Sequence, residues 1–355
     1  MASKTLFFLL WCSLLLNYCH GHKRLRLLAI VIVISGALQA FYGVVVQLAN
    51  FDVSPVIGMN EGNRARGSFV YQNHFANYLA LALSVAIGLL MSQLSGERTQ
   101  RSWRQLSRDI LSTMLSAKMM LRLAMILMVI GLVMSRSRMG NAAFFASLVA
   151  VALLALWFYK RPPALLKPLV ISILLLDMVL VSSMFGLEKL QQRYEDTSFA
   201  SEARDEVVVD SIPLLTEHGF TGSGGGTFYT VFPAVQPKPY SGFYDHAHND
   251  YLQFAIEVGV PITALLMLWL AWIAWQALKV MRTHEQKLER GLCFAVLMAM
   301  LHMALHSTVD FSLQAPANAL LFLTILMLAL ICSTKPAALK RRRSSQTALD
   351  KSASA

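Results

Sequence analysis

The segment from Tyr244 to Tyr251 reads Tyr-Asp-His-Ala-His-Asn-Asp-Tyr and ends where an apolar stretch begins. It holds His246 and His248 two residues apart. Imidazole is the side chain that most readily accepts or releases a proton near neutral pH. A general base needs one imidazole, a neighbour that orients it and a nearby cation that holds the leaving group. The segment therefore predicts proton-transfer chemistry on a substrate at a membrane edge.

The same pattern is compatible with a divalent metal ion, because imidazole and carboxylate groups are good ligands. The two histidines with Asp245 and Asp250 supply at most three ligands. Since no other His or Glu cluster on the same side completes the coordination sphere, we predict a site without metal and without a cofactor.

The composition indicates that transmembrane helices position these residues. Hydrophobic residues make up 56% of the 355 residues and charged residues 14%, against roughly 25% charged in a soluble domain. Apolar runs near the roughly 20 residues that cross a bilayer recur along the chain. We predict an all-α fold, a polytopic transmembrane helical bundle with about nine spans. The expected spans are 6–19, 25–49, 75–94, 119–135, 140–159, 165–186, 251–278, 291–313 and 317–332.

On the basis of these spans we divide the chain into three parts. Residues 1–24 are interpreted as an N-terminal anchor or remnant span, because Lys4 precedes a short apolar run without a small-x-small cleavage site. Residues 25–332 form the transmembrane domain, with one large periplasmic loop at 187–250. Residues 333–355 form a basic cytoplasmic tail that we expect to be disordered.

The distribution of Lys and Arg predicts the orientation of the chain. Most of the 31 basic residues lie in alternate connections and in the tail, so the 50–74 and 187–250 segments face outward. The net charge of +11 results from the basic connections on one membrane face, so it does not indicate a nucleic-acid partner. The Gly222–Thr227 run is interpreted as a tight bend, since a phosphate-binding loop requires a strand, a helix and a Lys-Ser or Lys-Thr that are missing.

Arginines occur on the outer side, where positive charge is normally depleted. Arg136 and Arg138 share one short turn, and Arg64 and Arg66 precede the third expected span. Arginine suits bidentate binding of phosphate, so these turns predict a site for a lipid phosphate or pyrophosphate. The alternative is that the side chains reach the lipid head groups.

Ionisable residues also occur within the apolar runs, and their presence in a membrane span needs an explanation. His302, His306 and Asp310 recur at intervals of four and share one helix face, and Glu257 also falls in an expected span. Such groups are costly in a membrane and indicate function, for example a proton relay. We favour the alternative that the His306–Asp310 pair joins helices or supports the outer site.

The blocks taken together resemble the O-antigen ligase and O-antigen polymerase superfamily of bacterial membrane glycosyltransferases. The resemblance covers roughly residues 30–330 in the order and spacing of its blocks. These blocks are Arg66-Gly-Ser-Phe with Asn73-His-Phe-Ala-Asn-Tyr-Leu, Ser135-Arg-Ser-Arg-Met-Gly, Ser201-Glu-Ala-Arg leading to Gly222-Ser-Gly-Gly-Gly-Thr-Phe, Ala247-His-Asn-Asp-Tyr-Leu-Gln with Glu257-Val-Gly, and His306-Ser-Thr-Val-Asp-Phe.

The resemblance implies transfer of a glycan from undecaprenyl pyrophosphate to an acceptor hydroxyl, with inversion and without metal or nucleotide. By position, His248 matches the family's loop histidine, which is proposed to deprotonate or orient the acceptor. Arg138 and Arg204 match arginines proposed to bind the pyrophosphate as it leaves. We expect these three residues to be catalytic. The candidate substrate-binding residues are Arg66, Arg136, Asn249, Asp250 and His246.

The expected partners are the lipid-linked donor, a lipid A core or glycan acceptor and membrane lipids. The expected location is the bacterial inner membrane, with the site facing the periplasm. A ligase and a polymerase of this superfamily differ only in the acceptor, and the sequence leaves both open. A transporter or flippase of an anionic lipid or sugar is a more distant alternative, which would require paired repeats with broken helices.

Overall fold

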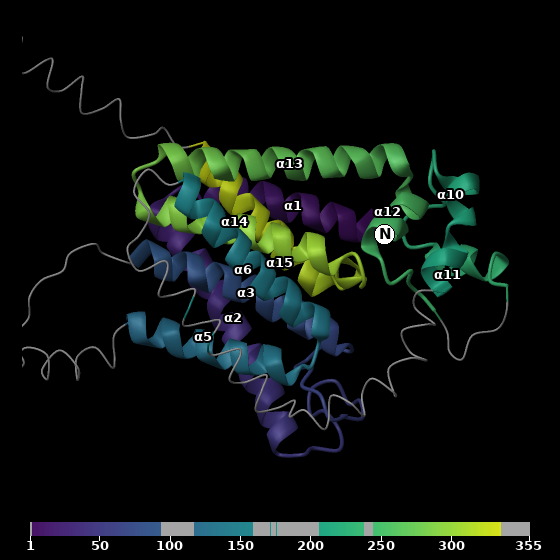
Figure 1. Ribbon diagram of the computed structural model, residues 1–355, viewed down its shortest axis with the longest axis horizontal. Helices are drawn as coiled ribbons and strands as arrows, with labels where there is room; N and C mark the ends of the chain where they lie inside the picture. Colours follow the sequence, from purple (N-terminus) through teal and green to yellow (C-terminus); the bar gives the residue numbers. More distant parts are fainter. Residues whose placement is uncertain are drawn as a thin grey trace, which may run out of the picture.

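The computed structural model describes residues 2–93, 117–158, 171, 175, 206–237 and 244–334. The described chain is helical apart from turns and one isolated β-bridge between Val53 and Asn60. The predicted all-α class is confirmed (Figure 1). The elements are α1 (Ala2–Tyr18), α2 (His22–Leu48), α3 (Gln72–Gln93), α5 (Ala117–Met134), α6 (Arg138–Phe158), α10 (Pro213–His218), α11 (Phe228–Val231), η1 (Phe232–Ala234), α12 (Asp250–Val258), α13 (Val260–Thr283), α14 (Lys287–His306), η2 (Ser312–Gln314) and α15 (Pro316–Ser333).

Six helices among the described residues are long and apolar enough to cross a membrane: α2, α3, α6, α13, α14 and α15. They support a multi-pass membrane protein, while the expected count of about nine spans is not confirmed. The segments expected at 6–19 and 119–135 are helical, as α1 and α5, but are not among the six. The span expected at 165–186 lies outside the described residues apart from Ile171 and Leu175.

The prediction of one continuous span over 251–278 is wrong. Helix α12 ends at Val258 and α13 begins at Val260, with Gly259 between them at a φ of 84°. A side chain is strained at this φ, and a Cβ there would lie 2.5 Å from the carbonyl oxygen of Phe220. Pro261 lies in the first turn of the new helix, where its missing N–H costs no helical hydrogen bond.

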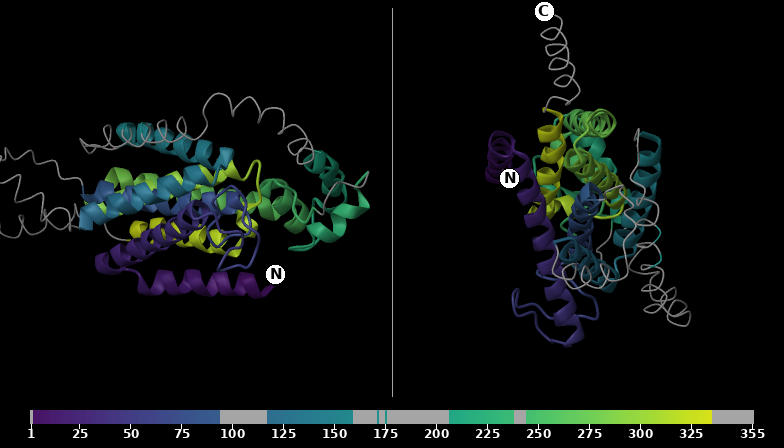
Figure 2. Two further views of the ribbon diagram at one scale, coloured as in Figure 1. Left: turned by 90° about the horizontal axis from the view of Figure 1, so that it is seen from below. Right: turned by 90° about the vertical axis from the view of Figure 1, so that its left-hand side faces the viewer.

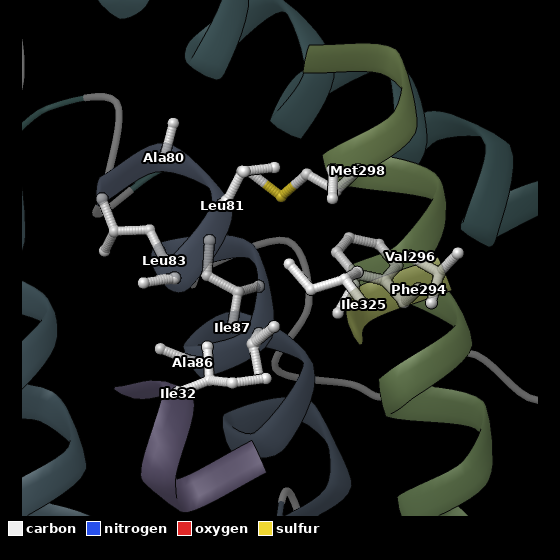
Figure 3. Close-up of a cluster of buried hydrophobic side chains, with 14 of the residues drawn as sticks. Ile32, Ala80, Leu81, Leu83, Ala86, Ile87, Phe294, Val296, Met298 and Ile325 are labelled. Atoms are coloured by element: carbon white, nitrogen blue, oxygen red, sulfur yellow. The ribbon is translucent and has the colours of Figure 1, made fainter. Parts of the chain in front are cut away.

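The centre of the bundle is formed by α3, which packs against α2, α5, α14 and α15. Of the six spans α3 is the most completely buried and α13 the least. Figure 3 shows the side chains that fill the space between these helices, among them Leu81, Ile87, Phe294 and Ile325. Gly88 of α3 and Gly291 of α14 face each other so closely that a Cβ on either would collide with the other's carbonyl oxygen. Small residues at such a crossing let two backbones approach, as is typical of helices in lipid.

The two ends of the bundle differ in chemistry. At one end the basic connections around 20–26 and 279–290 meet, because Glu289 contacts both His284 Nδ1, at 2.7 Å, and His22 Nε2, at 3.5 Å. At the other end, α12 and the short helices α10 and α11 extend past the bundle (Figures 1 and 2). This segregation agrees with the predicted sidedness, although most of the remaining basic connections and residues 335–355 of the tail lie outside the described residues.

The Gly88–Gly291 crossing is tested by Gly88→Ala. We expect this substitution to force α3 and α14 apart and to destabilise the bundle by about 1–3 kcal/mol, the usual cost of overpacking. The measurement is the thermal unfolding midpoint in detergent micelles. Gly21→Ala is the matched control, since a Cβ at Gly21 meets nothing within 4 Å. Equal midpoints for the two variants would contradict the proposed close crossing.

Candidate functional site

The candidate histidines lie on the loop that leads directly into α12, and this helix start is fixed to the end of α14. Asn249 caps α12, because its side-chain oxygen accepts a hydrogen bond from Leu252 N at 3.1 Å. The Asn249 side-chain amide donates to Thr308 O at 3.1 Å. The N–H of Asp250 donates to Ser307 O at 3.0 Å. Asn249 thus holds the histidine loop against the bundle.

Asp250 is a buried carboxylate at this junction. It is 1% exposed. It accepts hydrogen bonds from the Ser307 hydroxyl at 3.0 Å and from Leu313 N at 3.2 Å. Burial raises the pKa of Asp250 to about 7, and the charge of Asp310 acts in the same direction, although the hydrogen bonds from Leu313 and Ser307 oppose it. The structure therefore assigns this side chain to the α12–α14 junction, and its contact with substrate stays a prediction.

Four rings surround Phe311, the residue just before η2. His246 stacks on Phe311 with ring centroids 4.3 Å apart, and His248 meets it edge-on at 4.8 Å. His74 and Tyr71, at the start of α3, contact the same ring edge-on at 4.8 and 5.5 Å. Phe311 is 4% exposed. The ring cluster joins the loop histidines to α3 and to the end of α14.

His248 occupies an uncommon backbone conformation. Its φ is 53°, in the left-handed region that residues other than glycine seldom adopt. Such a conformation costs on the order of 1–3 kcal/mol and is concentrated at functional sites. The preceding Ala247 is fully buried in a small apolar core with Phe228, Phe232 and Ile256. The buried alanine fixes the backbone between the two histidines.

A chain of hydrogen bonds runs from His246 into α12. His246 Nδ1 lies 3.0 Å from the side-chain nitrogen of Gln253, and that nitrogen donates to Glu257 at 2.9 Å. Glu257 is 3% exposed and also accepts from Gly226 N at 2.8 Å and from Phe228 N at 3.3 Å. The sequence placed Glu257 within a span, whereas it lies in α12, outside the six candidate spans.

The glycine run forms the predicted tight bend. Gly222, Gly224 and Gly226 all have positive φ. Ser223 N and Gly224 N donate to the carbonyl oxygens of Ile256 and Glu257, both at 2.9 Å. The run therefore packs its backbone against the last turn of α12.

The turn that carries Arg136 and Arg138 lies at the same end of the bundle. Arg138 is the first residue of α6 and its side chain is exposed, while Arg136 is half-buried in the turn with a φ of 52°. A Cβ on Gly140 would approach Ala76 of α3 to 2.9 Å, which brings the start of α6 beside the start of α3. His74, on α3, belongs to the ring cluster. Arg204 lies outside the described residues.

Arg66 is engaged within its own loop. Its Nε donates to Glu61 at 2.8 Å, and its terminal nitrogen donates to the carbonyl oxygens of Met59 and Asn60. This guanidinium organises the 59–66 segment, and substrate binding by Arg66 stays a prediction.

The buried histidines of α14 make contacts that join helices. His302 Nε2 lies 2.9 Å from the side-chain oxygen of Asn77 on α3. His306 Nδ1 lies 3.2 Å from the Ser312 hydroxyl and 3.8 Å from Asp310. Helix α14 ends at His306, so the prediction that Asp310 shares a helix face with His302 and His306 is wrong. The contacts of His306 hold the end of α14 to η2, which supports the interpretation that the His306–Asp310 pair joins helices or supports the outer site.

Several residues of the cluster had no assigned site role in the sequence interpretation. Phe311, Tyr71 and Gln253 carry no charge and have no local spacing that indicates chemistry, and only their presence in or near the family blocks singled them out. In the described part of the chain, no group of three or more His, Cys, Asp or Glu side chains is arranged to hold a metal ion. Metal independence stays a prediction.

The fold and site define a multi-pass membrane protein with a histidine-containing polar site at one end of its helical bundle. Residues 123–267 match the family model of O-antigen ligase, Wzy_C. This match confirms the resemblance to the O-antigen ligase superfamily, and the matched segment includes Arg138, His246 and His248. No curated protein matches the chain.

The buried carboxylate generates a pH prediction for Asp250→Asn. Because the folded-state pKa of Asp250 is about 7 and its ordinary value is 3.8, the folded state holds this proton more tightly than the unfolded state. The free energy of unfolding of the wild type should therefore fall as pH rises through this window, by on the order of a few kcal/mol. Asparagine keeps the acceptor oxygen and does not titrate. Asp250→Asn should raise the thermal midpoint relative to wild type more at about pH 8 than at about pH 5.

The control is Asp52→Asn, at an exposed carboxylate of the 50–71 segment. Its difference from wild type should be the same at both pH values. A pH-independent difference for Asp250→Asn as well would show that Asp250 does not retain its proton in the folded protein.

Proposed function

We propose that the protein transfers an oligo- or polysaccharide from undecaprenyl pyrophosphate to an acceptor hydroxyl at the membrane surface. The O-antigen ligase match supports a membrane glycan-processing enzyme of the ligase and polymerase superfamily. The observation that carries the finer proposal is the position of His246 and His248. They are fixed to the end of the bundle by α12 and Phe311, at the same end as the turn with Arg136 and Arg138.

In the proposed reaction His248 is the general base. It accepts the proton of the acceptor hydroxyl while that oxygen attacks the anomeric carbon of the donor. The bond from the anomeric carbon to the pyrophosphate oxygen breaks, and its electron pair leaves with undecaprenyl pyrophosphate. Attack from the side opposite the leaving group inverts the anomeric centre, and no metal ion is required.

The arginines stabilise the leaving group. Negative charge grows on the pyrophosphate as the bond breaks, so fixed cations stabilise the transition state more than the bound donor. The exposed Arg138 at the start of α6 is suited to this role. Arg204 is proposed for the same role from its match to the family block. Arg136, in the same turn, contributes to binding.

The proposed location is the bacterial inner membrane with the site on the periplasmic side. The basic connections that meet at the opposite end of the bundle support this orientation, since cytoplasmic loops accumulate Lys and Arg. The acceptor is a lipid A core sugar for a ligase, or another lipid-linked repeat for a polymerase of the same superfamily. A transporter that moves its cargo along His302, His306 and Asp310 is disfavoured, since His302 pairs with Asn77 of α3 and His306 lies against Ser312 and Asp310.

His248→Asn tests the proposed base. Asparagine tolerates the left-handed φ of residue 248 better than most residues, so the variant should fold and reach the membrane as wild type does. Asparagine cannot accept the proton, and we expect transfer to fall by about 100-fold or more. The measurement is complementation of a host that lacks its own ligase or polymerase, with the polysaccharide ladder read on a gel. The species that disappears identifies the acceptor.

The matched control is His218→Asn in α10, away from Phe311, which should support transfer as wild type does. His302→Ala is measured beside it with membrane levels compared. Full activity of His248→Asn together with loss in His302→Ala would reject the transferase mechanism and favour transport.

A further inference from the structure

The orientation of the Gln253 side-chain amide is determined by its neighbours. Both carboxylate oxygens of the buried Glu257 accept hydrogen bonds from backbone N–H groups, so the atom of Gln253 that lies 2.9 Å from Oε1 is the donor nitrogen. The Gln253 oxygen then accepts from the N–H of Ala247 at 3.3 Å. Rotating the amide by half a turn would place oxygen against oxygen at Glu257 and nitrogen against N–H at Ala247. Both contacts disfavour the rotated form.

This orientation decides where His246 carries its proton. The Gln253 nitrogen has two hydrogens and gives one to Glu257. The second faces His246 Nδ1, 3.0 Å away. The Gln253 oxygen lies farther from Nδ1, at 3.3 Å, and already accepts from Ala247 N, so the shorter contact favours a lone pair on Nδ1. The other ring nitrogen, Nε2, lies 3.7 Å from the carboxylate of Asp245, an acceptor. The contacts on both sides of the ring therefore favour a proton on Nε2.

We propose that Gln253 and Glu257 are positioning residues that hold His246 as the Nε2–H tautomer, so that His246 donates a hydrogen bond to substrate and is not the base. The inference rests on the proposed transferase function and deepens it. Nδ1 is occupied by Gln253, and Nε2 already carries a proton. A neutral His246 held this way has no free nitrogen with which to deprotonate an acceptor, which leaves the base to His248.

The group beside His246 Nε2 indicates the chemical class of ligand that His246 binds. The carboxylate near Nε2 belongs to Asp245, whose side chain is about half exposed at 47%. An anionic oxygen is thus the kind of atom that this N–H faces, and an exposed carboxylate can yield its position to a ligand. His246 is suited to a phosphate oxygen of the lipid-linked donor. Stacking on Phe311 holds the ring plane, as the 4.3 Å centroid distance shows.

Hydrogen bonds link the glycine run, Glu257, Gln253 and His246, and we call this chain of contacts the relay. The buried carboxylate of Glu257 makes the relay rigid. Besides Gln253, Glu257 accepts from Gly226 N in the glycine run and from Phe228 N just after it, so it cannot turn away without leaving both backbone N–H groups unpaired. An unpaired buried group costs about 1–3 kcal/mol. The relay therefore runs from the glycine run through Glu257 and Gln253 to the ring of His246.

The tautomer can be measured directly in the full-length protein, labelled with ¹⁵N-histidine and reconstituted in lipid nanodiscs without substrate. At about pH 8, where an ordinary imidazole is neutral, His246 Nδ1 should give a pyridine-type ¹⁵N shift and Nε2 a pyrrole-type shift. The resonances are assigned from the signals lost in His246→Gln. A pyrrole-type Nδ1 in the wild type would overturn the proposal. This readout does not depend on transfer activity, so it stands whether or not the proposed function survives.

Two variants test whether the relay sets the tautomer. Gln253→Met keeps the shape of the side chain and removes its donor, and Glu257→Gln replaces one of the two acceptor oxygens of residue 257 with a donor nitrogen. Both should convert the single tautomer of His246 into a mixture. His218→Gln, outside the relay, should leave it unchanged. An unchanged tautomer in folded Gln253→Met or Glu257→Gln would overturn the positioning role.

The donor role is tested by a matched pair at residue 246. The amide nitrogen of glutamine reaches the position of Nε2 and can donate, whereas the amide of asparagine reaches only the position of Nδ1. His246→Gln should keep most of the transfer activity, and His246→Asn should lose about 10- to 100-fold, the value of a hydrogen bond to a charged group. Loss of transfer in folded His246→Gln equal to that in His246→Asn would overturn the donor role. Full activity of His248→Asn would instead reject the proposed base and leave the tautomer result intact.

Discussion

The site depends on the requirement that polar groups be paired where α12 meets the end of α14. Polar atoms buried at a bundle end have little water to replace a lost partner, and an unpaired one costs several kcal/mol in an apolar surrounding. Asp250 meets this requirement at Oδ2, which accepts from both Ser307 and Leu313, whereas its buried Oδ1 has no hydrogen-bond partner among the described residues. The cap at Asn249 does the same for the first turn of α12. The direction in which the histidine loop leaves the bundle follows from these pairings.

Through its ring contacts, Phe311 makes the position of the loop histidines depend on the packing of the helical bundle. Its ring contacts His246 and His248 from the loop and His74 from α3, and each such aromatic contact adds about 0.5–1.5 kcal/mol beyond the area it buries. The place of His74 in turn depends on how α3 lies along α14, which the Gly88–Gly291 crossing fixes. A change in helix packing deep in the bundle therefore reaches the histidines through one apolar ring.

The sequence predicts what depends on local composition and misses what depends on distant contacts. Long apolar runs predict α2, α3 and α15, because a helix in lipid needs only length and hydrophobicity. The break at Gly259 is missed although Gly259 followed by Pro261 is a local helix-end signal. The surrounding apolar residues match one continuous span, and the requirement for glycine comes from backbone neighbours such as Phe220 that are distant in the sequence. The family blocks mark Arg66 as a binding residue, but nothing in its spacing indicates that Glu61 engages it. Phe311 reaches partners more than 60 residues away, as its contacts with His246 and His74 show.

The break at Gly259 gives the polar residues of α12 their function. In one continuous span Glu257 would lie in the apolar run, where an ionised side chain without partners is costly. With the helix interrupted, the last turn of α12 turns its backbone and the Glu257 carboxylate to the Gly222–Thr227 run, whose N–H groups pair with them. Only glycine at residue 222 allows this approach, because a Cβ there would collide with the carbonyl oxygen of Glu257. The break at Gly259, the glycine run and the Glu257 carboxylate depend on one another. Gln253 joins this rigid group to His246 through its hydrogen bonds.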